Sequence, residues 1–160
     1  MMYNFKPMTK HMAEMIMTWE YPAPYDFYNF DSSDESMEEL MNGEYYGAFD
    51  HQNQLAGFFC CGNSARLPGG YDAGIYVEEN RLDIGLGMKP SLTGNGQGSL
   101  FVADGLQFMK ERYKQDLFRL AVATFNTRAI NVYKKNGFVE RDTLLSKVHG
   151  TDVQFLCMET

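Results

Sequence analysis

The chain has 160 residues and a formal net charge of −7, with 44% hydrophobic and 22% charged residues. This length and balance predict one globular domain over residues 1–160, and the excess of acid argues against a nucleic acid partner. There is no run of about 18 apolar residues and no basic segment followed by an apolar stretch at the N-terminus, so the sequence predicts no membrane partner, no signal peptide and a cytoplasmic location.

The first part of the chain predicts strands and helices from the spacing of its apolar residues. In chain order these are a strand over 2–6, a helix over 11–19, a short helix over 36–41, and hairpin strands over 44–49 and 55–62. Thr9 has a side chain suited to cap the first helix. The methionine-rich stripe of that helix predicts core packing rather than a cofactor site.

The connection between the first two helices is dense in aromatic residues. Pro22 and Pro24 end the helix, and Tyr21, Tyr25 and Tyr28 follow one another within eight positions. Tyrosines in a loop supply apolar area with a polar tip, which predicts the wall of a substrate-binding cleft. The alternative is a small hydrophobic cluster of structural origin.

Charge is distributed unevenly along the chain. Between His11 and Ala65 there are ten Asp or Glu and no Lys or Arg, whereas residues 66–160 carry 12 basic and 11 acidic side chains. An acidic region concentrates cations, so a small-molecule amine or a basic peptide is the expected partner. The alternative is that the acidic run over 31–44 is a solvated face.

The second part of the chain alternates strands and helices. In order we expect a surface loop over 63–80, a strand over 82–88, a helix after the glycines at 94, 96 and 98, a strand over 117–125, a helix over 129–135, and hairpin strands over 139–148 and 152–158. Cys60, Cys61 and Cys157 have neither disulfide nor metal-site spacing, and we interpret them as buried strand residues.

The glycine-rich turn after the strand at 82–88 is a candidate anion site. A strand, a glycine-rich turn and a helix together aim backbone N–H groups and the positive end of a helix dipole at an anion. No Lys-Ser/Thr follows the last glycine and the spacing is G-x-G-x-G, so neither a nucleotide P-loop nor a dinucleotide fingerprint is present. The alternative is a plain connector.

A second motif follows the strand at 117–125. Its fixed positions are Asn126, Ala129, Tyr133, Gly137 and Phe138. Together with the loop Thr93-Gly-Asn-Gly-Gln-Gly98 after Met88-Lys-Pro90, it resembles the GNAT superfamily of acyl-CoA-dependent N-acyltransferases. Thr93 stands where that family usually has Gln or Arg.

The resemblance implies a mixed α/β fold. Its central twisted sheet would have about six to seven mostly antiparallel strands, with helices on both faces and a splay at the central strand. Gly85 and Gly87 are consistent with a bulge at that splay. A homodimer is compatible with the family.

The resemblance also implies an activity. The chain would be an N-acetyltransferase that moves an acetyl group from acetyl-CoA to a primary amine of a small molecule or a protein N-terminus, by direct attack in a ternary complex. The alternative is a non-catalytic acyl-CoA-binding sensor or regulatory module. No metal is implied.

Roles are implied for the residues that match the motifs. Backbone N–H groups from Gly94 to Ser99 would hold the diphosphate of CoA. The full set implied to contact the cofactor is Leu86, Gly87, Met88, Thr93, Gly94, Asn95, Gly96, Gln97, Gly98, Ser99, Asn126, Tyr133 and Lys135. The amide of Met88 would polarise the thioester carbonyl, and Tyr133 would protonate the departing thiolate.

A general base is harder to assign. Asp83 is the carboxylate nearest in sequence to the reactive carbonyl, but strand alternation puts it on the opposite face from Met88, where it would be surface-facing or salt-bridged. Glu20, Asp26 or a water chain are alternatives. For Tyr133 the alternative is a helix residue that packs on the sheet.

Overall fold

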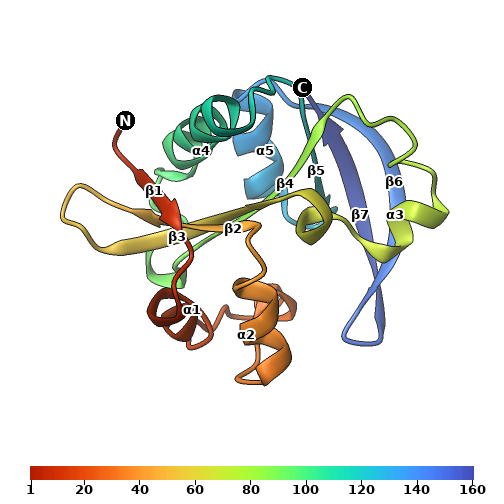
Figure 1. The fold of residues 1–160 in the computed structure, drawn as a ribbon. Helices are drawn as coiled ribbons and strands as arrows, with labels where there is room; N and C mark the ends of the chain where they lie inside the picture. Colours follow the sequence, from red (N-terminus) through yellow and green to blue (C-terminus); the bar gives the residue numbers. More distant parts are fainter.

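Seven strands of the 160 residues described by the computed structural model pair into one mixed sheet, in the order β1-β2-β3-β4-β5-β7-β6 (Figure 1). The strands are β1 (Asn4–Pro7), β2 (Tyr45–Phe49), β3 (Leu55–Cys61), β4 (Leu82–Met88), β5 (Phe118–Ala123), β6 (Val139–Val148) and β7 (Thr151–Glu159). All neighbours are antiparallel except β4 and β5, which are parallel. The predicted mostly antiparallel mixed sheet is therefore confirmed.

Helices cover both faces of this sheet, as predicted (Figure 1). They are α1 (Lys10–Ile16), α2 (Asp34–Leu40), α3 (Pro68–Asp72), α4 (Gly98–Tyr113) and α5 (Thr127–Lys135), with 3₁₀ turns at Tyr25–Tyr28, Gly62–Ala65 and Pro90–Leu92. On one face α4 and α5 bury Phe101, Val102 and Ile130 in the larger core cluster. On the other face α1 and α2 bury Ile16 and Leu40 in a second cluster.

The start of α1 confirms its predicted cap, because the Thr9 hydroxyl oxygen accepts a hydrogen bond from the Met12 N–H at 3.2 Å. Met12 is buried in the second core cluster, as expected for a methionine stripe that serves packing. The helix ends at Ile16, before the predicted end at Trp19. Trp19 is nevertheless buried, 7% exposed, in the same cluster.

The sheet splays open between β4 and β5. Their parallel pairing consists of Leu82 with Phe118 and Asp83 with Arg119, and beyond these residues the strands separate. From Ile84 onward β4 is paired only with β3. The predicted splay at the central strand is therefore present, and it leaves one edge of β4 without a neighbouring strand.

The predicted bulge at Gly85 and Gly87 is wrong. The register between β3 and β4 runs without a shift from Cys61 opposite Ile84 to Gly57 opposite Met88. The glycines are needed for close packing instead. A Cβ on Gly85 would lie 2.8 Å from the Cys60 sulfur, and one on Gly87 would lie 2.7 Å from the Phe58 ring.

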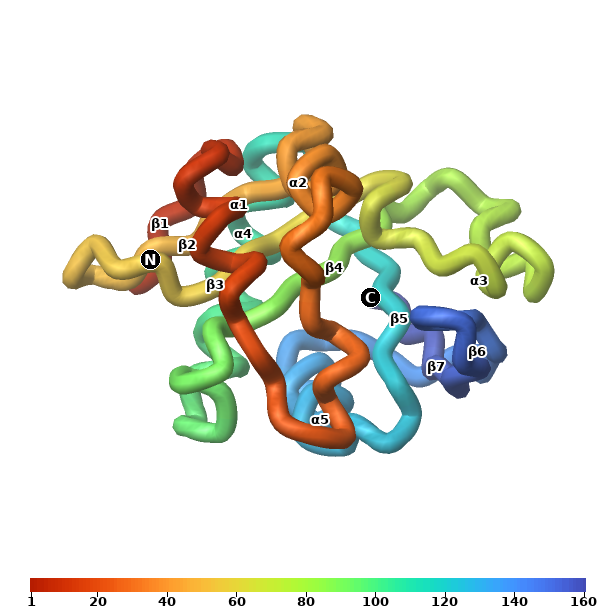
Figure 2. Tube along the Cα trace, turned by 90° about the horizontal axis from the view of Figure 1, so that it is seen from below, coloured from red at the N-terminus to blue at the C-terminus, as the bar shows by residue number.

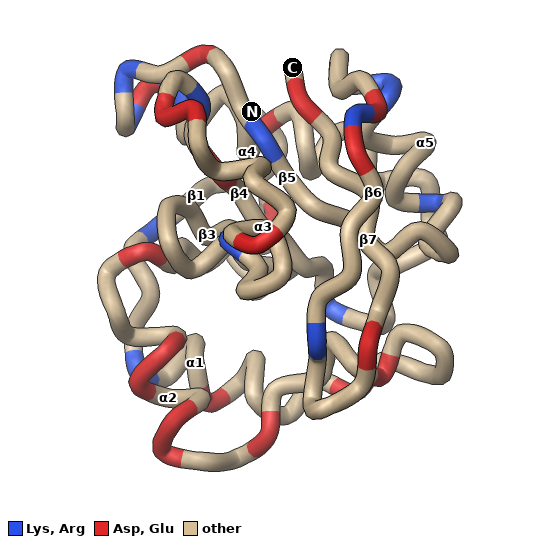
Figure 3. Tube along the Cα trace, turned by 90° about the vertical axis from the view of Figure 1, so that its right-hand side faces the viewer, with Lys and Arg blue, Asp and Glu red and all other residues tan.

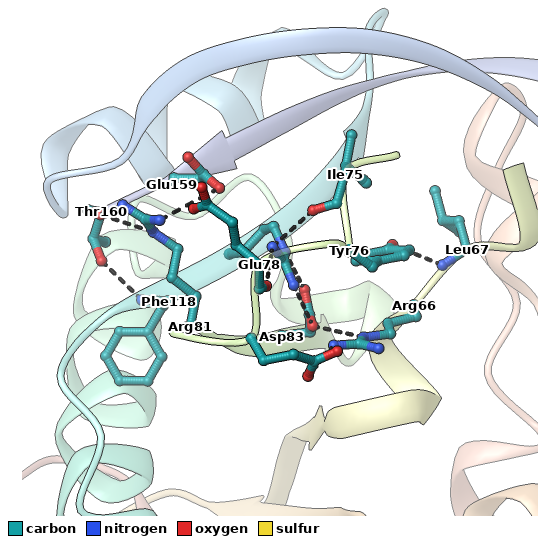
Figure 4. A network of polar contacts seen from close by, with 12 residues as sticks. Arg66, Leu67, Ile75, Tyr76, Glu78, Arg81, Asp83, Phe118, Glu159 and Thr160 are labelled. Atoms are coloured by element: carbon teal, nitrogen blue, oxygen red, sulfur yellow. Dashed lines mark hydrogen bonds and ion pairs between the residues drawn. The ribbon is translucent and has the colours of Figure 1, made fainter. Parts of the chain in front are cut away.

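A buried ion-pair network marks the point where the strands part (Figure 4). Asp83 accepts hydrogen bonds from Nε and Nη2 of Arg119 at 2.6 and 2.9 Å, and from Nε of Arg66 at 2.8 Å. The Asp83 and Arg119 side chains are only 3% and 2% exposed. The remaining guanidinium nitrogen of Arg119 donates to the carbonyls of Ile75 and Glu78 at 2.8 and 3.2 Å. Each charge is thus paired and hydrogen-bonded, as burial requires.

The predicted surface loop over 63–80 is wrong in part, because it contains α3 and the buried Tyr76. The Tyr76 ring lies 4.8 and 5.0 Å from the guanidinium carbons of Arg66 and Arg119. Its hydroxyl oxygen accepts a hydrogen bond from the Leu67 N–H at 2.9 Å. The segment is ordered by polar contacts to distant residues, which leave no apolar period in the sequence.

None of the helices is both long and apolar enough to cross a membrane.

We predict that Asp83→Asn lowers the free energy of unfolding by about 3–5 kcal/mol, because it leaves the Arg119 charge buried without its counter-ion. Urea unfolding followed by circular dichroism measures the loss. The control is Glu140→Gln, which removes an exposed pair with Lys134 and should cost at most about 1 kcal/mol. Equal losses of unfolding free energy in the two variants would show that the buried pair contributes no more to stability than the exposed one.

Candidate active site

The open edge of β4 presents unpaired backbone groups to the splay. On the β3 side, the Lys89 N–H donates to the Ala56 carbonyl at 2.8 Å. Backbone polar groups alternate between the two edges of a strand, so those of Leu86 and Met88 face the splay. The Met88 carbonyl confirms this direction, because it accepts a hydrogen bond from the Tyr21 hydroxyl at 2.6 Å.

The glycine-rich loop follows this edge and leads into α4. Gly94 and Gly96 both have φ of +76°, which a residue with a Cβ rarely adopts. The N-cap of α4 is Gln97, and no side chain makes a capping hydrogen bond to the first turn. The N–H groups of that turn are therefore available to an anion, and their donor chemistry fits a phosphate group. Thr93 turns back on the loop, since its hydroxyl donates to the Pro90 carbonyl at 2.8 Å.

Helix α5 packs beside the start of α4. A Cβ on Gly98 would lie 3.4 Å from Val132, and the Asn136 amide donates to the Ser99 carbonyl at 3.2 Å. Asn126 caps α5, because its side-chain oxygen accepts from the Ala129 N–H at 3.3 Å. Lys135 is exposed in the last turn of α5.

Tyr133 lies in α5 with its ring 9% exposed and packed edge-on against Phe138, at 5.9 Å between ring centres. Its hydroxyl has no hydrogen-bond partner in the protein, yet no buried side-chain polar atom is left unpartnered. The hydroxyl oxygen must therefore still touch solvent. Burial raises the pKa of Tyr133 well above the ordinary tyrosine value, and the nearby Tyr28 adds to the shift.

The aromatic connection between α1 and α2 crosses the splay. Figure 2 shows it running from α1 to the start of α5 and returning to α2. On the β4 side, Tyr21 is bonded to Met88, and the Tyr21 N–H donates to the side-chain oxygen of Asn29 at 2.7 Å. On the β5 side, the Tyr25 ring lies 5.7 Å from the Phe125 ring.

Tyr28 lies on the same side as Tyr25. Burial raises the pKa of its phenol, while the nearby Asn126 side chain and Ala123 backbone lower it in part. The three tyrosines predicted to line a substrate cleft therefore lie at the same opening as Met88 and Tyr133.

Asp83 does not join this group. Both of its carboxylate oxygens accept hydrogen bonds from arginine, and its side chain is 3% exposed. Of the alternatives considered from sequence, its salt-bridged state is the one observed. Glu20 and Asp26 are exposed in the aromatic connection itself. Acidic positions gather over α1, α2 and this connection (Figure 3).

Arg128 was not singled out from the sequence, although it lies within the Asn126–Ala129 motif. A Cβ on Gly94 would be 2.9 Å from one of its guanidinium nitrogens. On its other side the guanidinium carbon lies 5.6 Å from the centre of the Tyr25 ring. The sequence does show a cation in the first turn of the helix after β5. Its position beside Gly94 depends on the folded loop and could not be predicted.

Comparison with known proteins agrees with this arrangement. The family model described as Acetyltransferase (GNAT) family matches residues 12–138. No curated protein sequence matches the chain.

Two solved structures illustrate the likeness in fold. Spermidine N-acetyltransferase from Vibrio cholerae, in complex with CoA and spermine, is 16% identical with a TM-score of 0.74, over 99% of this chain and 95% of that chain. An acetyltransferase of the GNAT family from Bacillus anthracis is 13% identical with a TM-score of 0.73, over 100% and 95%. At such identities the likeness shows a shared fold.

Proposed function

The chain belongs to the Acetyltransferase (GNAT) family, and on this basis we propose that it transfers an acetyl group from acetyl-CoA to a primary amine by direct attack in a ternary complex. The observation that carries the proposal is the open edge of β4. There, the Leu86 backbone groups and the Met88 N–H have no neighbouring strand, and the strand leads into a glycine loop and an uncapped helix. One extended ligand with amides at one end and phosphates at the other fits both parts.

The residues present fit such a ligand. The N–H and C=O groups of Leu86 would pair with an amide of the pantetheine arm as an added strand does, while the Met88 C=O already accepts from Tyr21 and the Met88 N–H stays free. The N–H groups of the glycine loop and the first turn of α4 would hold the diphosphate. When bound, acetyl-CoA supplies a thioester, whose carbonyl carbon accepts the amine.

We propose that two groups of this chain act on the reacting atoms. The Met88 N–H, which faces the open edge, would donate to the thioester oxygen and stabilise the charge that develops there. As the C–N bond forms and the C–S bond breaks, the Tyr133 hydroxyl would give its proton to the departing sulfur. Its raised pKa keeps the phenol protonated at neutral pH, as a proton donor must be.

The amine must lose a proton, and the geometry argues against Asp83 as the acceptor of it. That carboxylate is held by Arg66 and Arg119 and is closed to solvent. Glu20 and Asp26 are the carboxylates of the aromatic connection, and both are exposed. We propose that the proton passes to one of them or directly to water, and that Asp83 has a positioning role.

The cysteines support direct attack rather than an acetylated thiol. Burial raises the pKa of Cys60 to about 12 and that of Cys157 to about 11, and it raises the pKa of Cys61 as well. Since the thiolate is the reactive form, all three side chains stay unreactive at neutral pH.

The acceptor we propose is a cationic amine. The support is the connection that borders the splay, which carries the exposed carboxylates of Glu20 and Asp26. The Vibrio cholerae relative of the same fold is in complex with spermine, which is such an amine. An acidic border raises the local concentration of a cation.

One observation favours a second candidate, a non-catalytic acyl-CoA sensor. The carboxylate nearest the reacting centre in sequence, Asp83, is fully engaged, and Thr93 bonds within its own loop. Such a module would bind acetyl-CoA without turnover. The two predictions on ligand binding and turnover separate it from the enzyme.

Acetyl-CoA at 100 times its dissociation constant should stabilise the protein by about 2.7 kcal/mol, seen as a rise in melting temperature, whereas ATP and NAD should not. Gly96→Ala should lose most of this gain, because a Cβ there would stand in the path of the diphosphate. Gly74→Ala is a matched control, since both glycines have a similar positive φ and open surroundings. Both variants should lose about 1–2 kcal/mol of intrinsic stability. If acetyl-CoA stabilised both variants equally little, the glycine loop would not be the diphosphate-binding site.

Thiol release from acetyl-CoA should be faster with spermine than with a primary amine whose chain is otherwise uncharged. Glu20→Gln and Asp26→Asn should each raise the KM for spermine about two- to fivefold, as expected for exposed charges, and change the KM for the singly charged amine less. Asp116→Asn, exposed and outside the connection, serves as the control. Stabilisation by acetyl-CoA without thiol release with any amine would support the sensor instead.

Tyr133→Phe should lower kcat by about 10²-fold or more while the Kd for CoA stays within a factor of two, because the ring is kept and only the proton donor is lost. Stopped thiol-release assays and calorimetry measure the two quantities. Tyr113→Phe is the matched control, as its hydroxyl is bonded to Tyr46 at the other end of α4 from the glycine loop. An unchanged kcat in Tyr133→Phe would show that Tyr133 is not the proton donor to the departing sulfur.

A further inference from the structure

Arg128 makes no ion pair within the protein. The ion pairs of the protein involve Arg66, Arg81, Arg119, Lys134, Arg141 and Lys147, and Arg128 is in none of them. Its side chain is exposed, yet its guanidinium is held between Gly94 and the face of the Tyr25 ring. The position is thus defined by a loop and a ring, not by a carboxylate.

No acidic side chain of the first turn of α5 stands beside Arg128. Arg128 is the second residue of α5, whose first turn contains no acidic residue, and the start of a helix carries positive partial charge. The uncapped start of α4 lies beyond the same glycine loop. The Arg128 guanidinium therefore lies at the glycine loop that precedes the uncapped start of α4, in a chain whose net charge is −7.

We propose that Arg128 binds the diphosphate of the cofactor, as a clamp that closes over the glycine loop from the α5 side. A guanidinium presents a planar fork of donors that matches two phosphate oxygens, which a lysine cannot do. Because the guanidinium lies at Gly94, inside the loop, it meets the diphosphate and not the 3′-phosphate at the adenosine end. The inference rests on the proposed function.

Tyr25 has a different role in this arrangement from the one expected of it. Its ring backs the guanidinium, and it belongs to the same connection whose Tyr21 hydroxyl is bonded to Met88. Arg128 therefore joins the loop that holds the phosphates to the segment that lines the acceptor side. Tyr25 acts as a positioning residue through Arg128.

The test measures binding by calorimetry with three probes: CoA, dephospho-CoA, which lacks the 3′-phosphate, and pantetheine, which lacks both phosphate groups. Arg128→Met should weaken CoA and dephospho-CoA by the same factor, about tenfold to a hundredfold, and leave pantetheine unchanged. The affinity of Arg128→Lys for CoA should lie between those of the wild type and Arg128→Met, since lysine keeps the charge and loses the planar fork of donors. Lys110→Met, which removes an exposed cation from the far part of α4, should change nothing.

Tyr25 supplies an independent readout. Tyr25→Phe keeps the ring face and should bind CoA as the wild type does, whereas Tyr25→Leu should weaken CoA about two- to fivefold, the range for an exposed cation–π contact.

Each contrary result has a distinct meaning. Equal affinities of Arg128→Met and the wild type for CoA would overturn the clamp. A loss confined to CoA, with dephospho-CoA unaffected, would also overturn it, because the arginine would then bind the 3′-phosphate. Failure of the wild type itself to bind CoA would overturn the proposed function, and the clamp with it.

Discussion

The ion pair between Asp83 and Arg119 is the contact on which the geometry of the sheet depends. It joins β4 to β5 at the last residue where the two parallel strands are paired, and beyond it the strands separate. Burying two charges is costly unless both are fully hydrogen-bonded, and here Arg66 and two backbone carbonyls complete the set. The pair therefore fixes where the opening begins. The opening in turn leaves the Leu86 and Met88 backbone groups without a neighbouring strand.

An opening in a sheet exposes polar backbone that must find partners. The aromatic connection between α1 and α2 provides one, because the Tyr21 hydroxyl donates to the Met88 carbonyl. Within the connection the Tyr21 N–H donates to the Asn29 side chain, and on the β5 side the Tyr25 ring packs near the Phe125 ring. The connection thus spans both sides of the splay and leaves the Met88 N–H free. The density of aromatic residues in this stretch is explained by the need to bridge two diverging strands with rigid, partly polar side chains.

Much of this architecture could be read from the sequence, since hydrophobic period, turn residues and two motifs located all seven strands, the helices of both faces and the glycine loop. What could not be read depends on contacts between residues far apart in the chain. Asp83 was a candidate base because it is the carboxylate nearest in sequence to the reactive carbonyl, whereas the two arginines that hold it, Arg66 and Arg119, lie 17 and 36 positions away. Gly85 and Gly87 pack against side chains of β3 that no local pattern reveals. The order in 63–80 comes from Tyr76 and its two arginines, not from an apolar period.

The charges of the molecule divide between the two ligands of the proposed reaction. Acidic positions gather over α1, α2 and their connection (Figure 3), while Arg128 and the uncapped start of α4 border the glycine loop. Such fields act over about 8–10 Å at physiological salt, so each is felt mainly at its own side of the splay. An anionic cofactor and a cationic acceptor would therefore be drawn to different sides and meet at Met88 and Tyr133. A net charge of −7 is compatible with a phosphate-binding site for this reason: the distribution of charge, not its sum, governs which ligand is attracted where.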